Sequence, residues 1–156
     1  MAQQFPRRPP RLNTIFQNHK PLYFVTFNTF KRLPILANAA VHNRWLEFAK
    51  HSPQHSAWVG RYVIMPDHFH LFAWFGEDAV LAKWIQSLRA VIGKELLQIG
   101  HSKPHWQEGF FDHLLRSGES YEEKWEYVRL NPVRKGLCTR PEEWPYQGEI
   151  TELPWL

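Results

Sequence analysis

The chain has a single cysteine, Cys138, and no long uninterrupted run of apolar residues. One thiol cannot form a disulfide within the chain, which is typical of proteins that fold in a reducing compartment. No apolar run approaches the roughly 20 residues that a membrane helix needs, and residues 1–21 lack the apolar segment of a signal peptide. We therefore expect a cytoplasmic protein without a membrane partner.

The composition is rich in aromatic residues and moderately basic. Aromatic residues make up 15% and all hydrophobic residues 44% of the sequence, which is too much for a disordered chain. A length of 156 residues fits a single domain. The net charge of +4 suits a polyanionic partner such as DNA, but many unrelated globular proteins also reach it. Charge by itself therefore does not identify the partner.

Residues 1–21 form a basic segment that contains several prolines together with Arg7, Arg8 and Arg11. Proline fixes the backbone in an extended conformation, so we predict an extended arm. Such an arm either frays at the end of the chain or contacts nucleic acid, and the sequence favours neither interpretation. The folded domain is placed at residues 22–156.

Hydrophobic patterning after the arm alternates between strands and helices. Runs of aromatic and β-branched residues predict strands at 22–30, 57–65, 68–75 and 110–115. Apolar residues at spacings of three and four predict helices at 37–51, 78–99 and 120–130, the last beginning with a Ser120-x-x-Glu123 capping box. This order indicates a single-domain α+β fold with helices packed on an antiparallel sheet.

The helix predicted at 78–99 is amphipathic. Opposite its apolar stripe lie four side chains that are able to contact a phosphate backbone: Lys83, Gln86, Ser87 and Lys94. A plain solvated surface and a DNA-binding surface explain this face equally well.

Two histidines, His68 and His70, are separated by one residue inside a predicted strand. Alternate residues of a strand face the same way, so both imidazoles project from one face while Phe69 projects from the other. Neighbouring imidazoles form half of a site for a divalent metal. By itself the His-x-His pattern is weak, because ordinary surface or hydrogen-bonded histidines also produce it.

A tyrosine and an asparagine, Tyr127 and Asn131, are one turn apart near the end of the last predicted helix. At ~100° per residue, Tyr127 lies about 120° from the packing stripe of Tyr121, Trp125 and Val128. Tyr127 is therefore either free for a role other than packing or a partly buried aromatic with a bonded hydroxyl. Asn131 precedes a proline, so it is either a ligand or the cap of the next helical turn.

Four segments, in this order along the chain, resemble one known family. Residues 65–71 (MPDHFHL) resemble the His-hydrophobic-His strand of the HUH nucleases. Residues 106–113 (WQEGFFDH) and 127–137 (YVRLNPVRKGL) look like the C-terminal blocks of the REP-associated tyrosine transposases, and 144–146 (WPY) resembles their short closing block. The likeness runs from about residue 23 to 146.

The resemblance implies a ferredoxin-like domain with a five-stranded antiparallel sheet. It also implies a divalent metal, Mg²⁺ or Mn²⁺, held by His68, His70 and Asn131, with Tyr127 as the nucleophile. The implied reaction cleaves single-stranded DNA at hairpin-forming repetitive extragenic palindromes through a 5′-phosphotyrosine, and then rejoins strands. We expect a monomer associated with the bacterial nucleoid that binds hairpins carrying a single-stranded 5′ flank.

Two further residues are candidates for auxiliary roles. Asp67 precedes His68 and either tunes the metal or shapes the turn between the two strands. Lys124 lies one turn before Tyr127, where its charge favours a phenolate, although a solvated helix face explains it as well.

Two other functions remain as alternatives. The first is a domesticated hairpin-binding module that has lost cleavage; the presence of His68, His70 and Tyr127 speaks against it. The second is a small non-haem metal oxygenase that uses the two histidines with Asp67 and has no use for Tyr127.

Overall fold

The computed structural model describes residues 22–116 and 118–153. The arm predicted at residues 1–21, with Arg7, Arg8 and Arg11, lies outside the described residues. In the described part, no helix is long and apolar enough to cross a membrane.

A five-stranded sheet forms the centre of the domain, with the strand order β4-β1-β3-β2-β5. Every neighbouring pair of strands is antiparallel. The strands are β1 (Leu22–Asn28), β2 (Ala57–Ile64), β3 (His68–Phe75), β4 (Phe111–Leu115) and β5 (Gln147–Glu149). The four predicted strands are confirmed within two residues at either end.

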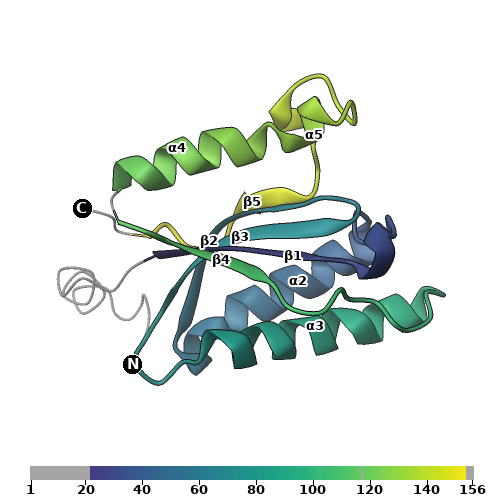
Figure 1. Cartoon of the computed structure of the whole chain (residues 1–156), viewed down its shortest axis with the longest axis horizontal. Helices are drawn as coiled ribbons and strands as arrows, with labels where there is room; N and C mark the ends of the chain where they lie inside the picture. The colour runs from purple at the N-terminus through teal and green to yellow at the C-terminus, as the bar shows by residue number, and fades with distance from the viewer. Residues whose placement is uncertain (1–21, 117, 154–156) are drawn as a thin grey trace.

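Helices cover both faces of the sheet (Figure 1). One face packs against α2 (Ala39–His51) and α3 (Leu81–Gln98), and the other lies beneath α4 (Gly118–Arg129) and the short α5 (Asn131–Arg134). Short 3-10 turns complete the described elements: η1 (Phe30–Arg32), η2 (Ser52–His55) and η3 (Pro141–Glu143).

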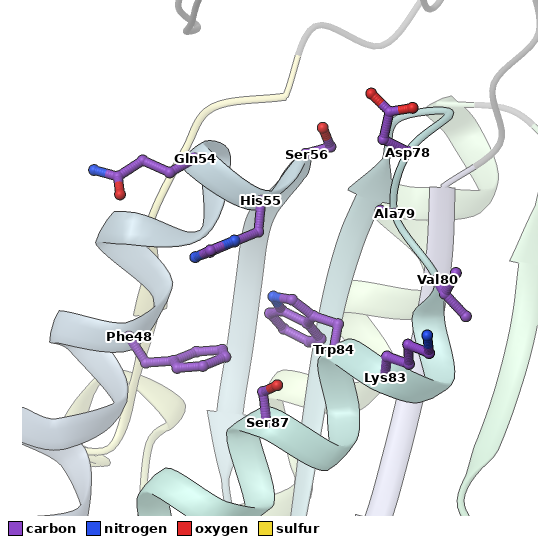
Figure 2. A pocket seen from close by; sticks show the side chains of 10 residues that line it. All are labelled: Phe48, Gln54, His55, Ser56, Asp78, Ala79, Val80, Lys83, Trp84 and Ser87. Atoms are coloured by element: carbon purple, nitrogen blue, oxygen red, sulfur yellow. The ribbon is translucent and has the colours of Figure 1, made fainter.

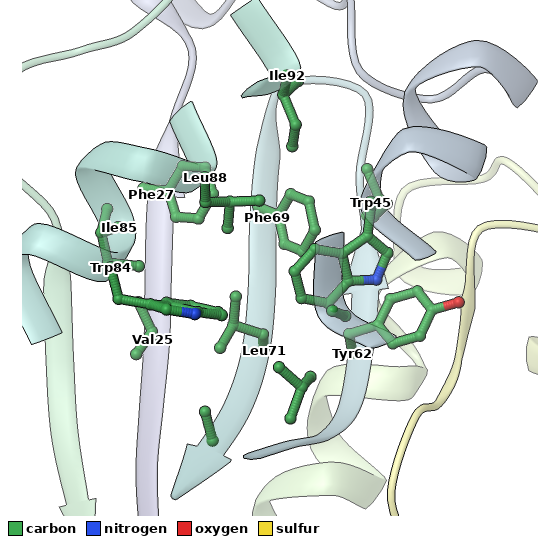
Figure 3. Close-up of a cluster of buried hydrophobic side chains, with 14 of the residues drawn as sticks. Val25, Phe27, Trp45, Tyr62, Phe69, Leu71, Trp84, Ile85, Leu88 and Ile92 are labelled. Atoms are coloured by element: carbon green, nitrogen blue, oxygen red, sulfur yellow. The ribbon is translucent and has the colours of Figure 1, made fainter. Parts of the chain in front are cut away.

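The face beneath α2 and α3 is a core of buried aromatic and aliphatic side chains (Figure 3). Phe69 and Leu71 of β3 point into it and are fully buried. Trp45 of α2 meets the Phe69 ring edge-on, at a centroid distance of 4.8 Å. Most of the predicted stripe of α3 is buried here, at Trp84, Ile85, Leu88, Ile92 and Leu96, whereas Leu81 at its start is half-buried.

The opposite face holds a second, smaller core beneath α4. Phe72 and Trp74 of β3 are buried there, and Tyr121 of α4 packs on Phe72 at a centroid distance of 4.8 Å. Trp144, from the closing Trp-Pro-Tyr block, donates its indole N–H to the carbonyl of Ile64 at 3.0 Å. This hydrogen bond attaches the Trp-Pro-Tyr block to β2.

Two details differ from the sequence prediction. Helix α4 begins at Gly118, so Ser120 is its third residue and the predicted capping box does not open the helix. Strand β5 was not predicted from the patterning, because three residues are too few to give an alternation and only pairing with β2 defines them.

Candidate functional site

His68 and His70 lie at the start of β3 on the face that α4 and α5 cover, as their spacing predicts. Their ring centroids are 4.7 Å apart and the rings are nearly perpendicular, at 82°. His68 is buried, with 7% of its surface exposed. The two imidazoles therefore form one compact group.

The His70 ring is fixed from both sides. Its Nδ1 lies 2.7 Å from the hydroxyl of Thr26, its direct neighbour on β1. Its Nε2 lies 3.0 Å from the amide nitrogen of Asn131. An amide NH₂ only donates, so Nε2 accepts and the ring proton sits on Nδ1, where it is donated to Thr26. The Nε2 lone pair thus points toward Asn131.

The His68 ring is fixed in the same sense by Asp67. Nδ1 of His68 is 2.8 Å from Oδ1 of Asp67, while Oδ2 accepts from Nε of Arg32 at 3.0 Å. Partial burial acts to raise the pKa of Asp67, but the bonds from His68 and Arg32 outweigh it and the pKa is lowered. Nη2 of Arg32, a donor, also lies 3.3 Å from this Nδ1, but the contact with Asp67 is shorter; an ionised carboxylate only accepts, so Nδ1 carries the proton. Nε2 of His68 has no hydrogen-bond partner among the described residues.

Both imidazoles are neutral at neutral pH. Burial is the largest cause and lowers the pKa of His70 to about 3, and the charges of Lys124 and Arg134 lower it further. Burial also lowers the pKa of His68, although Asp67 acts in the opposite direction. A neutral ring whose Nδ1–H is held by an oxygen atom presents Nε2 as a ligand.

Asn131 reaches the histidines from the junction between α4 and α5. The N-cap of α5 is Leu130 and no side chain caps that turn, so the capping alternative for Asn131 is wrong. Its amide nitrogen contacts Nε2 of His70 instead, and its amide oxygen accepts from Nη2 of Arg134 at 2.8 Å.

Tyr127 stands outside the packed part of α4, as its angular offset predicts. It is 62% exposed, whereas Tyr121 and Val128 of the same helix are 4% and 2% exposed. The guanidinium carbon of Arg134 lies 4.1 Å from the centroid of its ring. The described residues provide no hydrogen-bond partner for its hydroxyl, so the alternative of a buried, bonded phenol is wrong.

Lys124 belongs to the same region of the molecule. Its Nζ lies 5.0 Å from the ring centroid of Phe24, and this ring stacks on His70 at 5.3 Å. Its charge reaches His70, where it helps to lower the pKa. Lys124 therefore contributes to the local field instead of standing on a purely solvated face.

The donor set suits a divalent cation that retains part of its water. His68, His70 and Asn131 would supply two imidazole nitrogens and one amide oxygen, and water and phosphate oxygens would complete the coordination of such a cation. Among the described residues, no three His, Cys, Asp or Glu side chains converge on one point. Asp67 bonds the edge of His68 opposite to Nε2, so it does not join the histidines as an oxygenase carboxylate.

Helix α3, which carries the predicted DNA-contacting face, covers the side of the sheet opposite to α4 and α5 (Figure 1), whereas His70 contacts Asn131 of α5. All four side chains of the predicted face are exposed: Lys83, Gln86, Ser87 and Lys94. Lys83 and Ser87 line a cavity of about 520 Å³ between η2 and the start of α3, beside Trp84 (Figure 2). The structure therefore does not bring this face to the histidine site, and its contact with DNA stays a prediction.

Sequence reasoning missed three residues of the site: Thr26, Arg32 and Arg134. Thr26 is defined only by the register of β1 against β3, and Arg32 only by the turn that follows β1. Arg134 gave a weak signal, because it lies three residues after Asn131 and residues at that spacing share a helix face.

Comparison with known proteins supports the family likeness. No protein-family model matches the chain. A curated REP-associated tyrosine transposase of Escherichia coli (strain K12) is 26% identical over 91 residues, or 56% of this chain and 52% of that protein. A Haemophilus influenzae protein with the same family name is 27% identical over 96 residues, or 54% of each. The chain thus spans about half the length of the curated relatives it matches. The likeness that the motifs indicate is confirmed.

Two solved structures share the fold. A REP-associated tyrosine transposase bound to a REP hairpin gives a TM-score of 0.63 at 21% identity, over 85% of this chain and 88% of that one. A transposase-like protein from Deinococcus radiodurans R1 gives a TM-score of 0.50 at 16% identity, over 69% and 87%. The predicted α+β fold with a five-stranded antiparallel sheet is confirmed.

Proposed function

We propose that the protein is a metal-dependent endonuclease and strand transferase that acts on single-stranded DNA beside hairpin-forming repeats. One observation carries the proposal. Tyr127, which is exposed, lies four residues before Asn131, and both contact Arg134. The amide of Asn131 contacts Nε2 of His70, whose ring stands 4.7 Å from that of His68. A nucleophile next to a cation site is the arrangement that phosphodiester cleavage requires.

His68, His70 and Asn131 would hold the cation, Mg²⁺ or Mn²⁺. When bound, such a cation neutralises charge on the scissile phosphate and orients it for in-line attack. Thr26 and Asp67 each accept the Nδ1 proton of one imidazole, which keeps both rings in the tautomer that the ligand role needs. Lys124 and Arg134 add positive charge at His70, beside which the phosphate would bind.

Tyr127 supplies the attacking oxygen. A bond forms between this oxygen and phosphorus, the bond to the 3′-oxygen breaks, the phenol loses its proton and the 3′-oxygen gains one. The products are a 5′-phosphotyrosine and a free 3′-hydroxyl. The new ester keeps the energy of the phosphodiester, so a second 3′-hydroxyl can attack it and rejoin the strands without ATP.

The proposed substrate is a DNA hairpin with an unpaired 5′ flank, from repetitive extragenic palindromes of a bacterial chromosome. The solved relative bound to a REP hairpin supports this choice, as does the net charge of +4. Phosphate contacts release counterions, so affinity should fall as salt rises. All three metal-site residues come from one chain, which supports a monomer as the active form.

The decisive test replaces Tyr127 by Phe. The ring and its packing are kept, so hairpin affinity should stay unchanged, while cleavage and the covalent protein–DNA adduct should both be lost. The wild-type protein, with Mn²⁺ restored after EDTA treatment, should form an adduct that mass spectrometry places on the peptide containing Tyr127.

Tyr121→Phe is the matched control, because the hydroxyl of Tyr121 is buried and bonded to the backbone of Arg61 at 3.1 Å. This variant should still form the adduct. Cleavage by Tyr127→Phe at the wild-type rate would refute the nucleophile. Hairpin binding by the wild type without any adduct would favour the domesticated binding module.

A further inference from the structure

Arg134 is the one described side chain that contacts both the nucleophile and the third ligand of the proposed site. Its guanidinium carbon lies 4.1 Å from the centre of the Tyr127 ring, within the range of a cation–π contact. Its Nη2 donates to the amide oxygen of Asn131 at 2.8 Å. Arg134 is exposed, so the remaining N–H donors of its guanidinium face solvent.

These contacts fix the direction of the Asn131 amide. Arg134 only donates, so it holds Oδ1, and the NH₂ group is left to bond Nε2 of His70 at 3.0 Å. A divalent cation takes lone pairs from amide oxygens and imidazole nitrogens, not from an NH₂ group. The two atoms that a cation needs from Asn131 and His70 are therefore both engaged within the protein.

We propose that Arg134 is a positioning residue that holds the Asn131 amide away from the cation position and exchanges this contact for DNA phosphate when a cation binds. The inference rests on the proposed function. To ligate a cation, the amide must reverse, which turns its NH₂ toward Arg134. Two donors cannot bond each other, so the guanidinium leaves Asn131. The guanidinium of Arg134 stays on the ring of Tyr127. Its N–H donors can then bond the phosphate that Tyr127 attacks.

The proposal predicts that the loss of a site residue raises the affinity for the cation. Removing Arg134 should make cation binding tighter, because the competing bond to the amide oxygen is lost. At an exposed site, the loss of this competing hydrogen bond should raise the affinity for the cation about five- to tenfold. A merely structural role predicts the opposite, because a disturbed site binds its cation more weakly.

The test titrates Mn²⁺ into the metal-free full-length chain, without DNA, by calorimetry. Arg134→Met keeps an unbranched side chain on Tyr127 but removes the charge and the bond to Asn131. Lys124→Met is the matched control, because Lys124 is also a cation whose charge reaches His70, yet it makes no bond to Asn131. Arg134→Met should bind Mn²⁺ about five- to tenfold more tightly than the wild type, and Lys124→Met should gain clearly less. Equal gains, or weaker binding by Arg134→Met, would overturn the proposal.

A second measurement follows adduct formation with a hairpin oligonucleotide at saturating Mn²⁺. Arg134→Met should react at least tenfold more slowly despite its tighter metal, and Arg134→Lys, which keeps a cation near the ring, should recover part of the rate. A wild-type rate in Arg134→Met would overturn the phosphate role.

The two proposals fail in different ways. If the wild type binds Mn²⁺ but forms no adduct, cleavage is refuted and the titration still decides the role of Arg134. If no variant and no wild-type sample binds Mn²⁺, the metal site is refuted, and the exchange at Arg134 with it.

Discussion

Alternate residues of β3 point to the two faces of the central sheet. One face is an apolar core, whereas the other also holds the two histidines. On the face of α2 and α3, β3 contributes apolar side chains from one end to the other, including Phe69 and Leu71. On the face of α4 it contributes Phe72 and Trp74 at one end and the two histidines at the other.

The difference lies in what covers each end. Helix α4 packs on the apolar end through Tyr121, whereas the junction of α4 and α5 reaches the polar end through a single amide, that of Asn131. Burying polar groups is tolerated only where partners satisfy them. Thr26 and Asp67 satisfy Nδ1 of each ring. Asn131 satisfies Nε2 of His70, which leaves Nε2 of His68 without a partner among the described residues.

The largest expected effect is a loss of stability caused by a cavity in the core beneath α2 and α3. Phe69 is fully buried and stacks on Phe27 at a centroid distance of 5.1 Å. Phe69→Ala should lower the free energy of unfolding by about 3–5 kcal/mol, measured by urea denaturation. Phe111→Ala is the control, because Phe111 is 56% exposed on the edge strand β4, and it should change stability by under about 0.5 kcal/mol. Similar losses in both variants would contradict the described packing.

A smaller effect is expected on the face that holds the two histidines, and on affinity more than on stability. Thr26→Val keeps the shape of the side chain but removes the oxygen that holds Nδ1 of His70. Loss of such a partner typically weakens metal binding about 10- to 100-fold, which a Mn²⁺ titration measures. Thr139→Val, at an exposed residue without a contact to either histidine, should leave the affinity unchanged. Unaltered binding by Thr26→Val would mean that the ring is held by something else.

The smallest expected effect is the difference in stability between variants of two tyrosines on α4. Tyr121→Phe removes the hydroxyl that accepts from the backbone N–H of Arg61, which should destabilise the fold by about 1–2 kcal/mol. Tyr127→Phe removes an exposed hydroxyl and should change stability by under about 0.5 kcal/mol. Thermal denaturation of both variants in EDTA tests this order, and a reversed order would contradict the orientation of α4.

Much of the fold follows from local patterns. The spacing of Trp84, Ile85 and Leu88 fixes the buried face of α3, and period-two alternation separates Phe69 from its neighbouring histidines. Strand β5 escaped prediction because its three residues carry no period of their own. The start of α4 was misplaced because a serine followed by glutamate at the third position also occurs inside helices.

The sequence by itself determined that His68 and His70 share a face and that Tyr127 stands off its packing stripe, since both follow from the geometry of one strand and one helix. Only the tertiary structure decided which partners these side chains meet. Thr26 reaches His70 through strand register, and Asn131 reaches it across 61 residues of chain. The reason is physical: periodicity is a property of a single element, whereas a contact between elements depends on how the apolar faces of all of them pack together.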